Sequence, residues 1–435
     1  MERELSPARQ AWCAARAKIA ACAEMVWRLG ADDPRKVVHG LKVGLALAIV
    51  SHFYYLRPLY DGVGGAAMWA VMTVVVVFEF TVGGSLYKGL NRGAATLTGG
   101  GLAIGVHWAA SKAGQTGELV ILNGAVFILA SLVTFSRFIP VIKTRFDYGA
   151  TIFILTFSLV TVSGYRVDQL VNLAQQRLST IAIGISICLI ICTLICPVWA
   201  GTELHLLITS NMDKLADSLD CCVEDYFTGK EDRRTGGYKS VLNSKASEDS
   251  LGNLAVWEPA HGRFGFQFPW SQYQKIGAAL RNCAYCMEAL NATSHSQIQA
   301  PELMKKHLMD ACMKLSSKSS EILRELSSSI KSMRSTSSSS SALMAKEIKE
   351  AVEEVKRTLS SLPSNYQLSN EEDVEMLYRV KKQSLMESLP LVSFAFLLME
   401  ISVKVDAVDK AVQELAELAS FEPPAGDKIN IPINK

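Results

Sequence analysis

The sequence has 435 residues, of which 49% are hydrophobic, and its formal net charge is +2. Its mean hydropathy of +0.19 is high for a soluble protein. Charged side chains are spread unevenly, with 15 in residues 37–200 and 59 in residues 201–435. These properties argue against a secreted disulfide scaffold, a disordered chain and an ordinary soluble enzyme, and no basic arm indicates nucleic-acid binding.

This distribution predicts an all-α polytopic membrane protein in three parts. Residues 1–36 are charged and lack an apolar core, so we expect a cytosolic N-terminal segment. Residues 37–200 should form a transmembrane domain of six helices, and residues 201–435 a cytosolic helical domain. No motif of a known catalytic class occurs in a fitting context, so we expect neither an enzyme nor a bound cofactor.

Six apolar stretches approach the length needed to cross about 30 Å of hydrocarbon. They are Val37–Leu56, Ala66–Val82, Gly89–Ala110, Glu118–Phe135, Tyr148–Ser163 and Leu173–Trp199. The third stretch is rich in glycine, which allows helix backbones to approach closely in lipid. We therefore expect six membrane helices, with the third packed tightly against a neighbour.

Lysine and arginine residues indicate the orientation, because cytosolic loops of membrane proteins carry an excess of both. Seven of them precede residue 37. Five more lie at the turns after the second and fourth stretches, namely Lys88, Arg92, Arg137, Lys143 and Arg145. The opposite side has Arg57, Lys112 and Arg166. Both termini are therefore predicted to lie in the cytosol.

Four ionisable side chains lie inside the predicted membrane helices, where a charge is costly. Lys42 and Glu79 should lie at similar depth, so we expect a structural ion pair. Arg92 and Arg177 have no acid in their own helices and should lie at different depths. With Lys88, they are candidates for anion binding along an aqueous path, because a guanidinium offers a planar fork of donors to a carboxylate. The alternative is that both arginines extend to the membrane interface.

Acidic residues on the outer side are candidates for a cation site. Asp61 and Asp168 lie there with the amide of Asn172, and oxygen ligands of this kind bind hard cations. Two acids and one amide are few ligands, so the alternative is a set of solvated loop charges. No metal site is assigned with certainty.

The second half predicts helices over residues 204–226, 272–292, 301–334, 342–362 and 371–420. Ser335–Ser341 is predicted to be a solvated linker, and Phe264–Phe268 a loop that docks on helices. Leu389–Met399 is strongly apolar but shorter than a membrane span, which favours a buried core helix. Cys283 and Cys286 have a metal-site spacing without a second pair, so we interpret both as packing residues.

Several stretches resemble the plant aluminium-activated malate transporter family of anion channels. They are Asp33–Arg35, His39–Ser51, Trp69–Gly83, Lys88–Gly93, Arg137–Gly149, Ile152–Asp168, Pro197–Gly201 and Trp257–Pro259. The resemblance implies a homodimer with six transmembrane helices per chain that passively conducts malate and inorganic anions.

The same resemblance implies roles for individual residues. Arg92 and Arg177 map onto pore-facing basic positions of the family. Asp61 and Asp168 map onto an outer acidic region that binds aluminium in responsive members. Asn172 stands where the family pattern has a further acid, which weakens the expectation of aluminium as a partner.

The sequence therefore predicts a malate and inorganic-anion channel in the lipid bilayer of the plant plasma membrane, with the vacuolar membrane as the alternative location. Two other functions stay open. A proton-coupled secondary carrier would move the same anions, and a membrane-anchored scaffold would show no transport.

Overall fold

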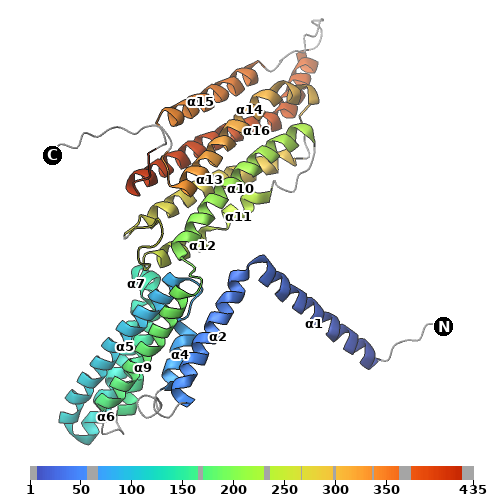
Figure 1. Ribbon diagram of the computed structural model, residues 1–435. Helices are drawn as coiled ribbons and strands as arrows, with labels where there is room; N and C mark the ends of the chain where they lie inside the picture. Colours follow the sequence, from blue (N-terminus) through green and yellow to red (C-terminus); the bar gives the residue numbers. More distant parts are fainter. Residues whose placement is uncertain are drawn as a thin grey trace, which may run out of the picture. The chain divides into compact units, whose positions relative to one another are not determined.

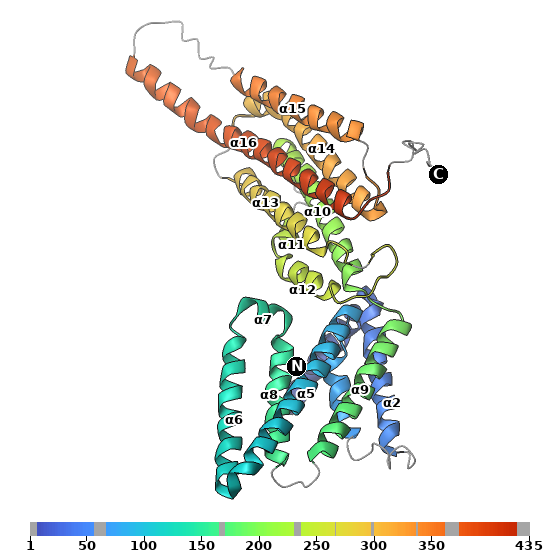
Figure 2. The same ribbon diagram turned by 90° about the vertical axis from the view of Figure 1, so that its left-hand side faces the viewer.

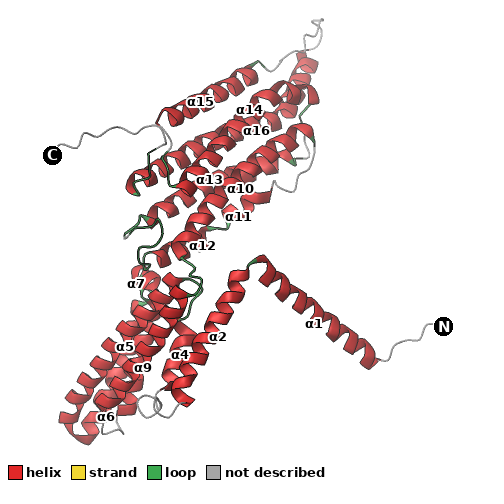
Figure 3. Ribbon diagram, in the orientation of Figure 1, coloured by secondary structure: helices red, strands yellow, loops and turns green. Residues whose placement is uncertain are grey.

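The computed structural model describes residues 7–55, 67–164, 170–229, 236–265, 267–296, 300–335, 338–361 and 374–423. Within these residues the chain is helical, with isolated β-bridges and no strand (Figure 3). The all-α prediction is confirmed. The chain divides into two compact units, Met1–Ala200 and Gly201–Lys435, each of which is described by itself.

The first unit begins with a helix that precedes the predicted membrane domain and continues through the predicted spans (Figure 1). Its helices are α1 (Pro7–Asp32), α2 (Pro34–Tyr55), α4 (Ala67–Val77), α5 (Val82–Ala110), η2 (Ser111–Ala113), α6 (Gly114–Ser136), α7 (Pro140–Arg145), α8 (Asp147–Gly164) and α9 (Leu170–Leu194). The helix α1 lies in the segment that was predicted only to be charged and cytosolic.

The six apolar stretches correspond, in chain order, to the helices α2, α4, α5, α6, α8 and α9. Among the described residues, Thr116–Ser136 and Gln175–Leu194 are long and apolar enough to cross a membrane. Met68–Val77 and Asp147–Ser163 are apolar but shorter. The count of six crossings therefore stays a prediction.

The helices of the first unit pack as two groups of three, which Figure 2 shows next to each other. In the first group, α2, α4 and α9 supply most of a core of buried residues, which Phe78 after α4 and Val82 at the start of α5 complete. Its other members are Ala46, Val50, Ala70, Val74, Val77, Cys188, Ile191 and Cys192. In the second group, α5, α6 and α8 pack around Ala103, Phe157 and Val160. The two groups meet where α5 contacts α9 and α4, a boundary that we call the seam.

Small residues and caps explain how these helices fit. A Cβ added to Gly99 of α5 would lie 3.0 Å from the Phe153 carbonyl oxygen, so α5 and α8 touch backbone to backbone. This contact confirms the close packing expected of the third apolar stretch. The start of α5 is fixed by Thr81, whose side chain accepts a hydrogen bond from the Gly84 N–H at 3.1 Å.

The second unit is a bundle of long helices. It contains α10 (Ala200–Thr228), α11 (Tyr238–Leu242), α12 (Lys245–Ala255), α13 (Trp270–Ser294), α14 (Glu302–Ser332), α15 (Ser338–Ser360) and α16 (Val374–Leu418). α16 packs against α13 and α14, and α15 covers α14. α15 begins at Ser338, inside the serine run, so the prediction of a linker through residue 341 was wrong. Serine costs a helix little more than most polar residues, so a serine run does not by itself end one.

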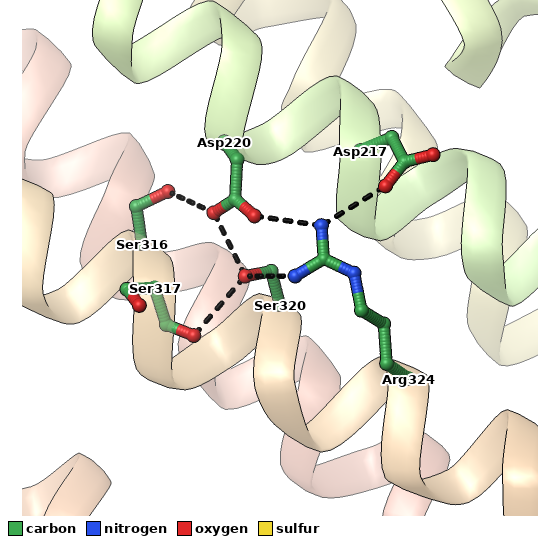
Figure 4. A network of polar contacts seen from close by, with 6 residues as sticks. All are labelled: Asp217, Asp220, Ser316, Ser317, Ser320 and Arg324. Atoms are coloured by element: carbon green, nitrogen blue, oxygen red, sulfur yellow. Dashed lines mark hydrogen bonds and ion pairs between the residues drawn. The ribbon is translucent and has the colours of Figure 1, made fainter.

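A polar network fastens α10 to α14 (Figure 4). The Arg324 guanidinium donates to Asp217 at 2.9 Å and to Asp220 at 2.8 Å. Asp220 also accepts from the hydroxyl of Ser320 at 2.7 Å and from that of Ser316 at 3.2 Å. Asp220 therefore has more hydrogen-bond partners than Asp217. Two of these partners are serines of α14, which lie within the helix and link it to α10.

The other packing predictions for this unit are confirmed. Leu389–Met399 lies in α16, where Phe394 is fully buried and stacks on Tyr226 with ring centroids 3.9 Å apart. Phe264 and Phe268 lie outside the helices and contact the Trp270 ring at 5.0 and 4.7 Å.

Cys283 is fully buried, and burial raises the pKa of its thiol to about 12. A buried thiol with such a pKa stays protonated at neutral pH, as is typical of a structural cysteine. Its role as a packing residue is therefore supported. In the described part of the chain, no group of three His, Cys, Asp or Glu residues could hold a metal ion.

Candidate functional site

Two buried arginines line one cavity in the first unit. Arg92 of α5 is 5% exposed and Arg177 of α9 is 8% exposed. The cavity of about 10 Å³ is lined by Trp69, Arg92, Thr96, Ile152, Leu155, Thr156, Leu159, Arg177 and Ile181. A space of this size holds roughly one water molecule. The two arginines therefore line one small space.

The cavity lies at the seam between the two helix groups. Trp69 and Arg177 come from α4 and α9 in the first group, whereas Arg92 and Thr156 come from α5 and α8 in the second. Arg92 lies about 15 Å from the start of α5, and Arg177 about 25 Å from the end of α9. Although the two residues are this far along their helices, their side chains line one space.

Neither guanidinium is paired with an acid among the described residues. The Nε atoms of Arg92 and Arg177 and the hydroxyl of Thr96 are buried without a hydrogen-bond partner. Arg92 donates from Nη1 to the Tyr148 hydroxyl at 3.3 Å, and the Arg177 guanidinium lies 4.2 Å from the centre of the Trp69 ring. A ring face and a hydroxyl stabilise a cation without neutralising it. The cavity therefore has an excess of positive charge and free donors.

Lys88 lies one helical turn before Arg92 on α5, on the same face. Its ammonium forms an ion pair with Glu79 and lies 5.7 Å from the centre of the Tyr148 ring. Tyr148 thus lies between Lys88 and Arg92. Lys88 does not line the cavity, and its positive charge is offset by Glu79.

Known proteins that are similar to the chain decide its family. The sequence profile described as "Aluminium activated malate transporter" matches residues 27–375. Aluminum-activated malate transporter 10 of Arabidopsis thaliana is 49% identical over 434 residues, which cover 93% of this chain and 87% of that protein. The chain belongs to the aluminium-activated malate transporter family.

Other members of the family are similar over comparable lengths. Aluminum-activated malate transporter 2 of Arabidopsis thaliana is 46% identical, with 91% of this chain and 77% of that protein covered. Aluminum-activated malate transporter 1 of Triticum aestivum is 43% identical, with 91% and 85% covered. The family resemblance that the sequence motifs predicted is confirmed.

The expected ion pair between Lys42 and Glu79 is replaced by two other contacts in this family member. Lys42 is 3% exposed and donates from Nζ to the carbonyl oxygen of Cys196 at 2.8 Å. Glu79 pairs with Lys88 instead. Glu79 lies after the end of α4, on the short connection to α5, where Lys88 is nearer.

The candidate cation site of the family lies outside the described part of the chain. Asp61 and Asp168 belong to residues that the structure does not describe, and the Asn172 side chain is likewise undescribed. Their assignment as an outer cation site stays a prediction.

Sequence reasoning missed Trp69, Tyr148 and Thr96, which surround the arginines. Trp69 and Tyr148 lie in motifs that carry the family resemblance, WAVMTVVVVFEFTVG and RFIPVIKTRFDYG. Thr96 is one turn after Arg92 on α5, so helical spacing could have placed it on the same face.

Proposed function

We propose that this chain is a passive anion channel that conducts malate, other carboxylates and inorganic anions, with a pore at the seam. One observation carries the proposal: Arg92 and Arg177 are buried at a shared cavity without an acidic partner. A buried charge that the fold leaves unneutralised is costly. An anion that passes between the two guanidinium groups would supply the missing charge and accept from the free donors.

The cavity is too small for a dicarboxylate, so this conformation is a closed one. Conduction requires the seam to widen around Arg92 and Arg177. Each permeating anion then exchanges part of its hydration shell for guanidinium donors, and a site that binds weakly lets it leave. Lys88 lies on the cytosolic side of this constriction and would draw anions toward it, with Glu79 reducing its strength.

The surface of the first unit supports a place in the bilayer. Large apolar side chains of α6 point away from the protein, with Phe127 exposed to 74% and Phe135 to 72%. Apolar exposure of this extent along one helix is typical of contact with lipid. We place the chain in the plasma membrane as a six-span homodimer, with the vacuolar membrane as the alternative and both termini in the cytosol.

The topology is tested by cysteine accessibility in intact cells. Cysteines introduced next to Gly114 and near Asp61 should react with an impermeant reagent from outside. Cysteines that replace Lys88 or Lys143 should react only after the membrane is opened. Outside labelling of either lysine position would contradict the orientation.

The pore is tested by membrane currents in malate and chloride gradients, with surface expression measured in parallel. Arg92→Ala and Arg177→Ala should each lower the current and the preference for anions. Because both side chains line one cavity, the double variant should lose less than the two single losses combined. Arginine-to-lysine variants should keep the preference for anions and change the malate-to-chloride ratio, since an ammonium lacks the planar fork.

The matched control is Lys143→Ala, which removes an exposed positive charge of α7 away from the cavity. It should leave currents and selectivity unchanged. If both arginine-to-alanine variants behave like this control, the arginines are interface residues and the pore lies elsewhere.

A proton-coupled carrier is the alternative for the same anions. Currents that reverse at the anion equilibrium potential support the channel, whereas reversal potentials that follow the proton gradient support the carrier. Aluminium added to the outer solution tests the proposed cation site at Asp61, Asp168 and Asn172, because binding there should change the current. The absence of current under every condition would support the non-transporting scaffold.

A further inference from the structure

The helix α1 carries an apolar stripe along one face. Its residues follow a spacing of three and four, which keeps them on one side of a helix. They are Trp12, Ala15, Ile19, Cys22, Val26 and Leu29, and we call them the α1 stripe. Trp12 is exposed to 70%, Ile19 to 69%, Val26 to 62% and Leu29 to 53%. The described part of the chain therefore leaves the large side chains of this stripe uncovered.

Basic side chains border the stripe on both sides. With 3.6 residues per turn, Arg16 and Lys18 lie roughly 80° to either side of its centre. Both are exposed. Glu24 lies on the opposite face, where it pairs with Arg28 at 2.6 Å. Glu24 thus lies away from the stripe and is paired with a base. The side chains that flank the stripe, Arg16 and Lys18, are positively charged and long enough to reach beyond the apolar face.

We propose that α1 is an interfacial helix that lies on the cytosolic leaflet, with the α1 stripe in the boundary between headgroups and acyl chains. In this position Arg16 and Lys18 contact anionic lipid headgroups, and Trp12 occupies the interfacial depth that tryptophan prefers. An amphipathic helix with basic borders and an aromatic apolar face has the physical properties of such membrane-surface helices.

The charge pattern favours a lipid surface over a second copy of α1. The spacing of the stripe would also fit a coiled coil, but its alternate positions hold the small residues Ala15 and Cys22, which make poor knobs. In a coiled coil the flanking positions carry partners of opposite charge. Between Trp12 and Leu29 those flanks hold Arg16 and Lys18 and no acid. A second α1 would therefore offer no partner charge, whereas an anionic membrane would.

The chain also places α1 beside the bilayer. α1 ends at Asp32 and α2 begins at Pro34, so the two helices are joined almost directly. Arg35 and Lys36 follow this joint. If α2 is the first span, as the proposed topology has it, α1 emerges at the cytosolic surface and meets lipid at a high effective concentration. The inference rests on this part of the proposed function and is independent of the pore.

The test uses the full chain in vesicles of phosphatidylcholine with about 30% phosphatidylserine, an anionic lipid. The photoreactive residue benzoylphenylalanine replaces either Ile19, in the stripe, or Glu24, on the opposite face. After illumination, mass spectrometry detects adducts with lipid and gels detect adducts between chains. We expect lipid adducts at position 19 and few at position 24. Adducts between chains at position 19, or equal lipid adducts at both positions, would overturn the proposal.

A second arm tests the headgroup assignment. The double substitution Arg16→Gln and Lys18→Gln should lower the lipid-adduct yield at position 19 in anionic vesicles by about fivefold for each charge removed. In vesicles of phosphatidylcholine alone, this substitution should change nothing. An equal effect in both vesicles would overturn the role of anionic lipid. Currents of the same variants report separately on the pore, so lipid adducts without currents would retain α1 and reject the channel.

Discussion

Lys42 of α2 donates a hydrogen bond from Nζ to the carbonyl oxygen of Cys196, 2.8 Å away, just beyond the end of α9. The last carbonyls of a helix have no partner within it and form the negative end of its dipole. The Cys196 carbonyl lies two residues beyond α9, so Lys42 satisfies a carbonyl of the segment that follows the helix and lies near the negative end of its dipole. A lysine that is 3% exposed is thus stabilised without an acid, and α2 is tied to the end of α9.

Lys42→Met should therefore destabilise the first unit. The variant keeps the length of the side chain but leaves the Cys196 carbonyl without its donor, which costs about 1–3 kcal/mol. Thermal unfolding of the detergent-solubilised chain measures this as a lower melting temperature. Lys36→Met is the control, because that exposed lysine only approaches Asp33 at 3.9 Å. Equal melting temperatures for both variants would contradict a capping role.

Gly99→Ala should loosen the contact between α5 and α8. The added Cβ would lie 3.0 Å from the Phe153 carbonyl oxygen and 3.3 Å from the Phe157 nitrogen, and backbone atoms cannot turn aside. We expect a loss of about 1–3 kcal/mol. Gly101→Ala, two residues along α5, meets nothing within 4 Å and should stabilise the helix by up to about 1 kcal/mol. Melting temperatures that move in the same direction would rule out this packing role.

Asp220→Asn should cost more stability than Asp217→Asn. Asp220 accepts from Ser316, Ser320 and Arg324, whereas Asp217 accepts from Arg324 and is exposed to 53%. We expect losses of about 1–2 kcal/mol and about 0.5 kcal/mol, respectively. Thermal unfolding ranks the two variants. The opposite order would mean that the pair between Arg324 and Asp217 contributes more than the contacts of Asp220.

Phe394→Ala should destabilise the second unit strongly. Phe394 is fully buried and stacks on Tyr226, so its removal leaves a cavity worth about 3–5 kcal/mol. Phe396→Ala, two residues away on α16, removes a ring that is exposed to 58% and should change stability by less than about 0.5 kcal/mol. Limited proteolysis of the full chain compares the two, and equal resistance would show that Phe394 is not part of the core.

His205 should make the second unit less stable as the pH falls. Burial, with Arg263 and Lys331 nearby, lowers the pKa of His205 from 6.5 to about 4. Between these values the unfolded chain binds a proton that the folded chain rejects, so stability is full above pH 6.5 and declines toward pH 4. The total loss is roughly 3 kcal/mol.

The measurement is the melting temperature from pH 7.5 to 4 for the native chain and for His205→Asn. The asparagine amide can still face the Tyr273 hydroxyl, which lies 2.9 Å from Nδ1 of His205, but it does not titrate. The difference between the two curves isolates the histidine from the carboxylates. A constant difference across this range would mean that His205 does not govern the acid response.

Patterns along the chain predicted most helices, because apolar stretches and helical spacing are local properties. Glu79 shows the limit of such reasoning: depth along antiparallel helices suggested Lys42 as its partner, but the connection between α4 and α5 turns it toward Lys88. The sequence also could not predict that Arg92 and Arg177 line one cavity, because this depends on how α5 and α9 pack in three dimensions. α1 was missed because its stripe contains small residues and lacks the continuous apolar core that signals a span.

The seam divides the first unit into two groups of helices that could shift relative to each other. Each group of three helices has a buried core, with Val82 at the start of α5 also joining the core of the first group, and α5 and α8 touch backbone to backbone at Gly99 within the second group. In the proposed channel, sliding one group along the other would change the width of the space beside Arg92 and Arg177. Shear of packed helices needs only small displacements of this kind. If the proposed channel opens in this way, side chains along the seam would set the energy difference between its closed and open states, and substitutions there should shift gating without unfolding the protein.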